Sequence, residues 1–270
     1  GRRSALKMLP PALKASGFLP TPTPVNLAVV GVQLLGALTS GLGEYAGQNA
    51  KYSKFAAGLP GIPSRQGMLI IYAAGLLVSL FGLMSATRAE DPRPRALLVA
   101  TMLVAHYLKR ELEVMFVHRY SGKIDLGTSC AISVFYGLAA LGILHYTPTQ
   151  LELGHVASVG AALFLLGSAG NGWHHALLAS LRSRSTKGSA AAYVVPSSGL
   201  FKLVACPHYL FELMAWLGVA MSSHSLFAYL NFASMLNYLS GRATATQAWY
   251  QNKFGDAYPA SRKALVPFIF

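Results

Sequence analysis

The feature that most constrains this chain is a series of long apolar segments, each close to the length of a membrane-spanning helix. A helix needs roughly 20 predominantly apolar residues to cross the hydrocarbon core of a bilayer. Seven segments approach this pattern, at about 25–43, 67–87, 96–117, 126–147, 156–180, 207–221 and 223–240. The first carries no charged residue, whereas the third, fifth and sixth are interrupted by polar groups. We therefore expect an all-α integral membrane protein with about seven transmembrane helices.

The composition agrees with a membrane domain rather than a soluble one. Charged residues make up 11% of the 270 residues and hydrophobic residues 53%, whereas a soluble domain carries about a quarter charged residues. The stretches between the apolar segments are short, and no separate soluble domain is expected. We expect a basic N-terminal tail over residues 1–24 and one membrane domain over residues 25–270.

The formal net charge of +13 is explained better by membrane topology than by nucleic-acid binding. Lys and Arg accumulate in the cytoplasmic loops of membrane proteins. With seven spans, 15 of the 22 Lys and Arg residues fall on the side of the C-terminus, which predicts a short cytosolic C-terminal tail. No basic patch interleaved with aromatic residues is found, so no nucleic-acid partner is expected. We expect the endoplasmic reticulum membrane, with the mitochondrial inner membrane as the alternative that the basic, acid-free N-terminal stretch leaves open.

A dense group of ionisable residues ends the third apolar segment, in the sequence AHYLKRELEVMFVHRY (105–120). At helical spacing, His106, Arg110 and Glu113 share one face, and Arg110 can pair with Glu113 or Glu111. Ionisable groups inside a membrane are costly and are functional candidates by default. The alternative is a helix end whose charges extend into the interfacial water, which suits the basic residues better than the acids.

The fifth segment holds a second polar group, GSAGNGWHHALLASLRSR (167–184). Its glycines allow another helix or a ligand to approach the backbone closely. Asn171, His174 and His175 lie within the span, and Arg182 lies at its expected cytoplasmic end. Adjacent histidines point about 100° apart on a helix. Since neither HxxxH nor HExxH occurs, no metal site is predicted.

The sixth segment holds a third polar group, GLFKLVACPHYLFELMAWLG (199–218). Pro207 is placed to open a helix at its first turn. His208 and Glu212 are four residues apart and can meet on one helical face, with Trp216 one turn further. A Glu at this depth needs a partner, which makes it either a functional group or a structural link between two helices.

The C-terminal tail, GRATATQAWYQNKFGDAYPASRKALVPFIF (241–270), mixes basic and aromatic residues. Together with Arg182, its residues Arg242 and Arg262 can form a basic entrance for an anionic ligand, because the planar fork of Arg suits phosphate. Neither GxGxxG after a strand nor GxxxxGK[ST] occurs. A nucleotide site in this chain must therefore be built from helix ends.

These motifs together resemble the 3-oxo-5-alpha-steroid 4-dehydrogenase (steroid 5α-reductase) family, which includes the trans-2-enoyl-CoA reductases. The most specific motif is FGDAYPASRKALVPFIF (254–270), followed by GLFKLVACPHYLFE (199–212). HYLKRELEVMFVHRYSG (106–122) and AGNGWHH (169–175) complete the order. The resemblance covers roughly residues 45–270 and is most specific over 106–270. KYSKF and GIPSRQGML are similar to the branch found in plants and algae.

The resemblance implies a seven-helix membrane fold that takes NADPH from the cytosolic side and reduces a carbon–carbon double bond conjugated to a carbonyl in a lipid. The substrate is either a 3-oxo-Δ4-steroid or a trans-2-enoyl-CoA. Tyr107 matches the family's carbonyl-binding tyrosine, and the enoyl-CoA side of the family adds Lys109 and Tyr250 as catalytic candidates. Glu212 matches a cofactor-site position and is a further catalytic candidate. The other residues that the resemblance places at the cofactor are Asn171, His175, Arg182, Tyr193, His208, Arg242 and Arg262.

Differences from the steroid-type members leave other interpretations open. Those members carry a Glu near the start of the second span, where PSRQGMLIIY (63–72) offers only Gln66. His208 and His175 replace an Asn and an Asp of the steroid enzymes, which makes a steroid ketone site the less supported version. The missing acid leaves open a catalytically silent structural subunit of a larger membrane complex. The CPHY motif followed by Glu212 also leaves open a membrane lipid methyltransferase, although the Arg-His pair of those enzymes is absent here.

Overall fold

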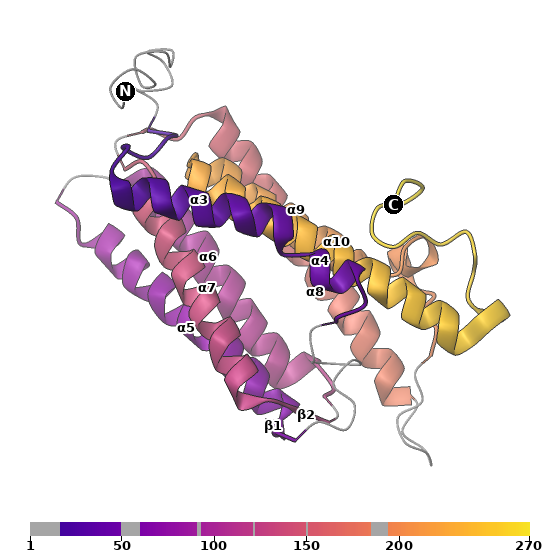
Figure 1. Cartoon of the computed structure of the whole chain (residues 1–270). Helices are drawn as coiled ribbons and strands as arrows, with labels where there is room; N and C mark the ends of the chain where they lie inside the picture. The colour runs from indigo at the N-terminus through magenta and orange to yellow at the C-terminus, as the bar shows by residue number, and fades with distance from the viewer. Residues whose placement is uncertain (1–16, 50–59, 91–92, 121, 150, 185–193) are drawn as a thin grey trace.

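The structure is a computed structural model that describes residues 17–49, 60–90, 93–120, 122–149, 151–184 and 194–270, without the side chains of 182–184. Its helices are α3 (Pro24–Thr39), α4 (Leu42–Tyr45), α5 (Ser64–Thr87), α6 (Pro94–Leu112), the π-helix η2 (Glu113–Val117), α7 (Leu126–Tyr146), α8 (His155–Arg184), the 3₁₀ helix η3 (Gly199–Lys202), α9 (Pro207–Ser223), α10 (Leu226–Phe254) and the 3₁₀ helix η4 (Gly255–Ala257). Two short strands, β1 (Ile62–Pro63) and β2 (Lys123–Ile124), pair antiparallel. The described part is a helix bundle (Figure 1), as the sequence predicts.

Each of the seven apolar segments forms a helix, and the largest difference from the prediction lies in α10. This helix continues to Phe254, well past the predicted end at residue 240. Gly241 lies inside it, where a glycine usually weakens a helix by about 1 kcal/mol. Here the missing side chain lets α4 pack closely, because a Cβ at Gly241 would lie 2.9 Å from the carbonyl oxygen of Gly41.

The helices begin where local capping rules place them. Thr23, Asp125 and Ser225 each accept a hydrogen bond from the backbone amide three residues later, at 3.1, 2.6 and 3.3 Å. The bond from the first-turn amide holds the pKa of the Asp125 carboxyl below its usual range. Pro207 occupies the first turn of α9, which confirms the start predicted for that helix.

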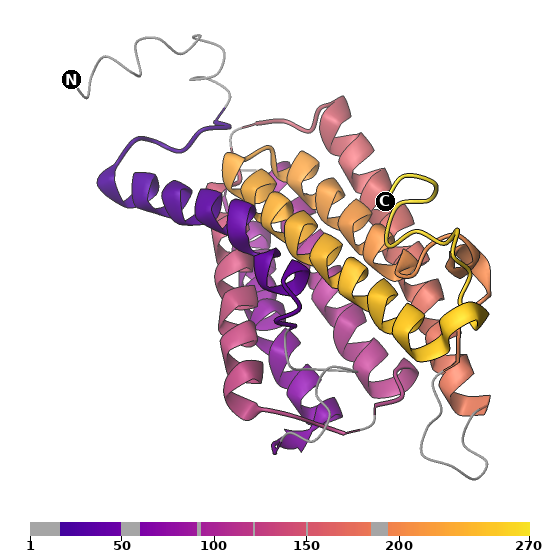
Figure 2. The same ribbon diagram turned by 45° about the vertical axis from the view of Figure 1, so that its right-hand side comes forward.

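The bundle joins helices that are neighbours in the chain with helices that are not (Figures 1 and 2). α5 packs against α6 and α7, and α8 packs most extensively against α9. The α8–α9 contact depends on Gly167, where a Cβ would lie 2.7 Å from the carbonyl oxygen of Phe211 on α9. The close helix approach that the glycines of α8 predict is therefore confirmed.

α3 joins the bundle through α10, although the two helices are about 200 residues apart in the chain. Ser40, just after α3, donates a hydrogen bond of 2.6 Å to the carbonyl oxygen of Ser234. Asn237 donates one of 3.1 Å to the carbonyl oxygen of Ala37. These bonds place the end of α3 beside the middle of α10, as both views show.

The outer surface of the bundle is apolar, which suits contact with lipid. Val32 and Leu38 on α3, Phe81 on α5 and Leu165 on α8 are each between 66% and 72% exposed. Among the described residues, four helical segments are long and apolar enough to cross a membrane: Pro24–Tyr45, Ser64–Thr87, Leu126–Tyr146 and His155–Leu181. The chain is therefore an integral membrane protein with an all-α architecture.

Candidate active site

A cavity of about 610 Å³ lies between helices α5 to α10 and is also lined by the segment that follows η2. Five residues predicted from the sequence line it: Tyr107, Asn171, His175, His208 and Glu212. The other lining residues are largely apolar or aromatic, and they come from both halves of the bundle. Such a mixture, an apolar wall with a few polar groups that converge, is typical of a small-molecule site.

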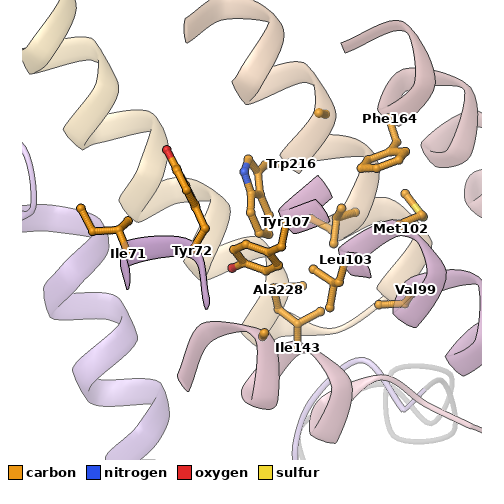
Figure 3. Packing of buried hydrophobic residues seen from close by; sticks show 14 of the residues in the cluster. Ile71, Tyr72, Val99, Met102, Leu103, Tyr107, Ile143, Phe164, Trp216 and Ala228 are labelled. Atoms are coloured by element: carbon orange, nitrogen blue, oxygen red, sulfur yellow. The ribbon is translucent and has the colours of Figure 1, made fainter. Parts of the chain in front are cut away.

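Tyr107 projects from α6 into the centre of the bundle and is 1% exposed. Its ring lies against Gly75 of α5, where a Cβ would lie 2.5 Å from the ring atoms Cε1 and Cζ. Figure 3 shows the ring beside Trp216, whose ring centroid is 6.2 Å away. The Tyr107 hydroxyl donates to the backbone carbonyl of Tyr136 over 3.4 Å. A bond of this length is weak, so the phenol proton can be given to a better acceptor.

The buried carboxylate of Glu113 forms ion pairs with two basic side chains of α6. Arg110 Nη1 lies 2.7 Å from Glu113 Oε2, and Lys109 Nζ lies 2.7 Å from Glu113 Oε1. The predicted pairing of Arg110 with Glu113 is therefore confirmed. Glu113 is the first residue of the π-helix η2, and such irregular turns are frequent at functional sites.

Asn171 connects α6, α8 and α9 at the cavity. Its Oδ1 accepts a hydrogen bond of 2.5 Å from Lys109 Nζ. Its Nδ2 donates one of 2.9 Å to the carbonyl oxygen of His208. The side chain is 2% exposed, so these two bonds fix the direction of the amide group.

The ligand atoms of Glu113, His118 and His175 lie within 4.8 Å of one another, which is the spacing of a metal site. The guanidinium of Arg110 already lies among them, with Nη1 2.7 Å from Glu113 Oε2 and 3.0 Å from His175 Nδ1. This guanidinium already neutralises the Glu113 carboxylate, and its positive charge would repel a metal cation. The group therefore does not fit a metal ion.

Glu212 projects from α9 into the cavity. Its Oε1 accepts a hydrogen bond of 3.1 Å from Trp216 Nε1, one helical turn away as the sequence predicts. Its second partner is His106 on α6, whose Nε2 lies 3.4 Å away. The meeting of the His208 and Glu212 side chains that their spacing allows stays a prediction, and the backbone carbonyl of His208 accepts a hydrogen bond from Asn171. Glu212 thus links α9 to α6 at the wall of the cavity.

Arg242 lies outside the cavity lining, in a buried pair between α10 and α4. Its Nη1 lies 3.0 and 3.1 Å from the two carboxylate oxygens of Glu44. Arg242 is 1% exposed and Glu44 is 4% exposed. The structure therefore gives this arginine a structural contact, and a contact with a cofactor stays a prediction.

Tyr250 and Arg262 also lie outside the cavity lining and meet at Tyr258. The rings of Tyr250 and Tyr258 stack with centroids 5.6 Å apart, and the Arg262 guanidinium lies 4.9 Å from the centroid of Tyr258. Arg262 donates to the carbonyl oxygen of Pro196 over 2.9 Å. Burial raises the pKa of Tyr258. Of the two remaining predicted residues, Tyr193 lies outside the described residues, and so does the side chain of Arg182.

Several tyrosines that line the cavity were not predicted as site residues, among them Tyr72 on α5 and Tyr136 on α7. Each lies alone in an apolar span without a charged neighbour, so the density of polar groups that marks Tyr107 is absent. A buried phenol still needs a hydrogen-bond partner. A single tyrosine in the middle of an apolar span was the signal that could have found both.

Comparison with known proteins identifies the family of the chain. The family described as "3-oxo-5-alpha-steroid 4-dehydrogenase" matches residues 128–270. A "Polyprenal reductase 2" of Oryza sativa subsp. indica is 39% identical over 121 residues, which are 44% of this chain and 33% of the relative. A "Steroid 5-alpha-reductase DET2" of Gossypium hirsutum is 38% identical over 111 residues, 41% of this chain and 42% of the relative.

A longer match is the "Very-long-chain enoyl-CoA reductase" of Dictyostelium discoideum. It is 30% identical over 192 residues, which are 67% of this chain and 60% of the relative. The matches to these three relatives thus span from one third to three fifths of the relatives' lengths. The family match covers more than half of the chain. The chain belongs to the 3-oxo-5-alpha-steroid 4-dehydrogenase family.

Proposed function

We propose that the chain is an NADPH-dependent reductase of a carbon–carbon double bond conjugated to a carbonyl in a lipid. The observation that carries the proposal is the buried Tyr107 hydroxyl at the wall of a largely apolar cavity that also holds Asn171 and Glu212. The three relatives are named for a steroid, an enoyl-CoA and a polyprenal. All three compound classes include a carbonyl conjugated to a double bond, so we propose this group as the reacting part of the substrate.

The residues at the cavity fit NADPH in charge and in hydrogen bonding. The cofactor is a polyanion, and the lining includes Arg110 and Arg119, whose guanidinium groups suit phosphate. The carboxamide of the nicotinamide both donates and accepts hydrogen bonds. The side chain of Glu212 can accept from it, and that of Asn171 can donate to it or accept from it. We assign Asn171, His175, His208 and Glu212 to the cofactor. Arg182, Tyr193, Arg242 and Arg262 remain proposed cofactor residues on the strength of the resemblance.

The proposed reaction needs a group that stabilises negative charge on the substrate. When bound, NADPH supplies a hydride to the β-carbon of the conjugated system. The electron pair of the double bond then forms a new double bond between the α-carbon and the carbonyl carbon, the carbonyl π pair moves onto the oxygen, and Tyr107 stabilises that charge by donating a hydrogen bond. A proton from water then adds to the α-carbon, and the carbonyl group re-forms.

Two further residues keep a proposed catalytic role with different support. Lys109 acts through Asn171, to which it donates a bond of 2.5 Å. Tyr250 stacks on Tyr258 outside the cavity lining, so its role rests on the resemblance. A substrate of either class, steroid or acyl-CoA, suits the apolar lining.

For the membrane arrangement, we propose seven spans within one membrane domain over residues 25–270. The seven long helices among the described residues and the excess of Lys and Arg on one side support this count and a cytosolic C-terminal tail. We propose the endoplasmic reticulum membrane, with the mitochondrial inner membrane as the alternative.

Titration of NADPH into the detergent-purified protein, followed by tryptophan fluorescence, tests the cofactor proposal. Trp216 lines the cavity, so bound cofactor should quench its emission, and Trp216→Phe should lose most of the signal. Trp173→Phe is the matched control, because Trp173 is 56% exposed and does not line the cavity. Absence of binding at millimolar NADPH would contradict the proposal and favour a silent structural subunit. Binding of S-adenosylmethionine instead would favour the methyltransferase.

A further inference from the structure

We propose that His106 is a positioning residue of the reductase site, which holds one oxygen of the Glu212 carboxylate so that the other accepts a hydrogen bond from the carboxamide of the nicotinamide. The inference rests on the proposed reductase function and deepens it by adding a residue that acts through Glu212. A carboxylate only accepts hydrogen bonds, and it can do so at both oxygens. Which oxygen is available to a ligand therefore depends on the partners of the other one.

The way Glu212 divides its two oxygens is the first argument. Its Oε1 accepts a hydrogen bond of 3.1 Å from Trp216 Nε1, and His106 Nε2 lies 3.4 Å from the same oxygen. Its Oε2 receives no hydrogen bond from the residues that the structure describes. Glu212 lines the cavity, so Oε2 is the oxygen left for a donor on a bound molecule.

The fixed position of His106 is the second argument. The residue lines the cavity from α6 and is 5% exposed. Its ring packs edge-to-face on Trp216 with centroids 4.7 Å apart and on Tyr107 with centroids 5.2 Å apart. Figure 3 shows these two aromatic neighbours side by side. The imidazole therefore has little freedom to turn, and its Nε2 stays directed at Glu212.

The identity of this partner as a histidine is the third argument. The two cations one turn further along α6, Lys109 and Arg110, each pair with Glu113 at 2.7 Å. An arginine in contact with Glu212 could bind both carboxylate oxygens with its planar fork, which would leave no oxygen for a ligand. An imidazole directs a single N–H at its partner. His106 therefore occupies one oxygen of Glu212 and leaves the second available.

A carboxylate that is held before the cofactor arrives should bind it more tightly. A glutamate side chain rotates about three bonds, and fixing it on a ligand costs conformational entropy. The contacts with Trp216 on α9 and His106 on α6 fix the side chain of Glu212 in advance. The N–H of the carboxamide then meets an acceptor that is already in place, and less entropy is lost on binding.

The test compares two cofactors by calorimetry on the detergent-purified protein. NADPH carries the carboxamide N–H, whereas its analogue with an acetyl group in place of the carboxamide carries no donor there. His106→Phe keeps an aromatic ring for packing and loses the N–H. We expect it to raise the Kd of NADPH by about tenfold, roughly the loss of one hydrogen bond. The Kd of the analogue should stay at its wild-type value, because the analogue cannot donate to Glu212.

Two further substitutions identify the ring nitrogen that matters. His106→Gln places an amide N–H near the position of Nε2 and should restore most of the NADPH affinity. His106→Asn places it near the position of Nδ1 and should bind NADPH as weakly as His106→Phe. His145→Phe is the matched control and should bind both cofactors like the wild type, since His145 is exposed on α7 and does not line the cavity.

The outcomes separate the inference from the proposed function. An unchanged Kd of NADPH in His106→Phe would overturn the inference, and so would an equal weakening of both cofactors, which indicates general damage to the site. Both results leave the proposed function intact. If His106→Phe does not fold, the other two substitutions decide, and equal Kd values of NADPH in His106→Gln and His106→Asn would overturn the inference. A wild-type protein that binds no NADPH would overturn both.

Discussion

The ring of Tyr107 rests directly on Gly75 of the neighbouring helix, with no space for a side chain between them. A Cβ at Gly75 would lie 2.5 Å from the Cε1 and Cζ atoms of Tyr107. The two residues come from α5 and α6, so their contact sets both the distance between these helices and the depth of the phenol in the cavity. The position of the hydroxyl thus depends on a residue that has no polar group of its own.

Gly75→Ala should therefore reduce turnover by displacing the Tyr107 ring. A misplacement of about 1 Å in an active site can cost roughly 10²-fold in rate, and we expect a loss of at least tenfold in kcat. Gly82→Ala is the matched control on the same helix, since its Cβ would lie 2.5 Å from the flexible end of Leu144, away from the cavity lining. Equal turnover in the two variants would contradict the proposed role of the contact.

Tyr107→Phe should lower kcat by about 10²-fold, because the enolate oxygen loses a hydrogen-bond donor. The bond of the hydroxyl to Tyr136 is long, at 3.4 Å, so thermal stability should change little. Steady-state kinetics and a melting curve in detergent measure the two effects. Undiminished turnover would show that Tyr107 takes no part in catalysis.

Asn171→Leu should raise the Kd of NADPH by about tenfold, equivalent to roughly 1.4 kcal/mol. The substitution removes the amide that accepts from Lys109 and donates to His208, and a lost hydrogen bond of this kind costs about this much. Asn237→Leu is the control, because Asn237 bonds to Ala37 of α3 and does not line the cavity. A similar Kd in both variants would exclude Asn171 from cofactor binding.

Glu44→Leu should destabilise the protein by about 3–5 kcal/mol, because it leaves a buried arginine without its carboxylate. The Arg242–Glu44 pair is almost fully buried, with oxygen–nitrogen distances of 3.0 and 3.1 Å. The double variant Glu44→Leu/Arg242→Met should recover much of that loss. Unfolding in detergent measures both, and a single variant as stable as the wild type would show that the pair contributes little.

The helices were the predictable part of this fold, because their signal is local. Apolar runs predict where α3 and α5 to α9 begin to within a few residues, and Pro207 opens α9 as expected. The end of α10 was predicted too early, since polar residues after 240 suggested a tail. Those residues are buried by α4 and by the C-terminal segment, a long-range effect that no local pattern contains.

The site was predictable where charge is dense and unpredictable where partners come from distant helices. Arg110 and Glu113 are three residues apart, and their pairing follows from helical spacing. Glu212 pairs with His106, more than a hundred residues away, besides its local partner Trp216, and Arg242 pairs with Glu44 on α4. Tyr72 carries no local signal, because its partner Arg110 lies on another helix.

The most direct test of the central claim follows the hydride itself. The purified protein is incubated with NADPH deuterated at C4 of the nicotinamide and with each of the three substrate classes, and the products are analysed by mass spectrometry. The proposed reaction predicts a saturated carbonyl product that carries one deuterium at the β-carbon, and a sharply reduced yield with Tyr107→Phe. Bound NADPH with no deuterium transferred to any of the three would contradict it.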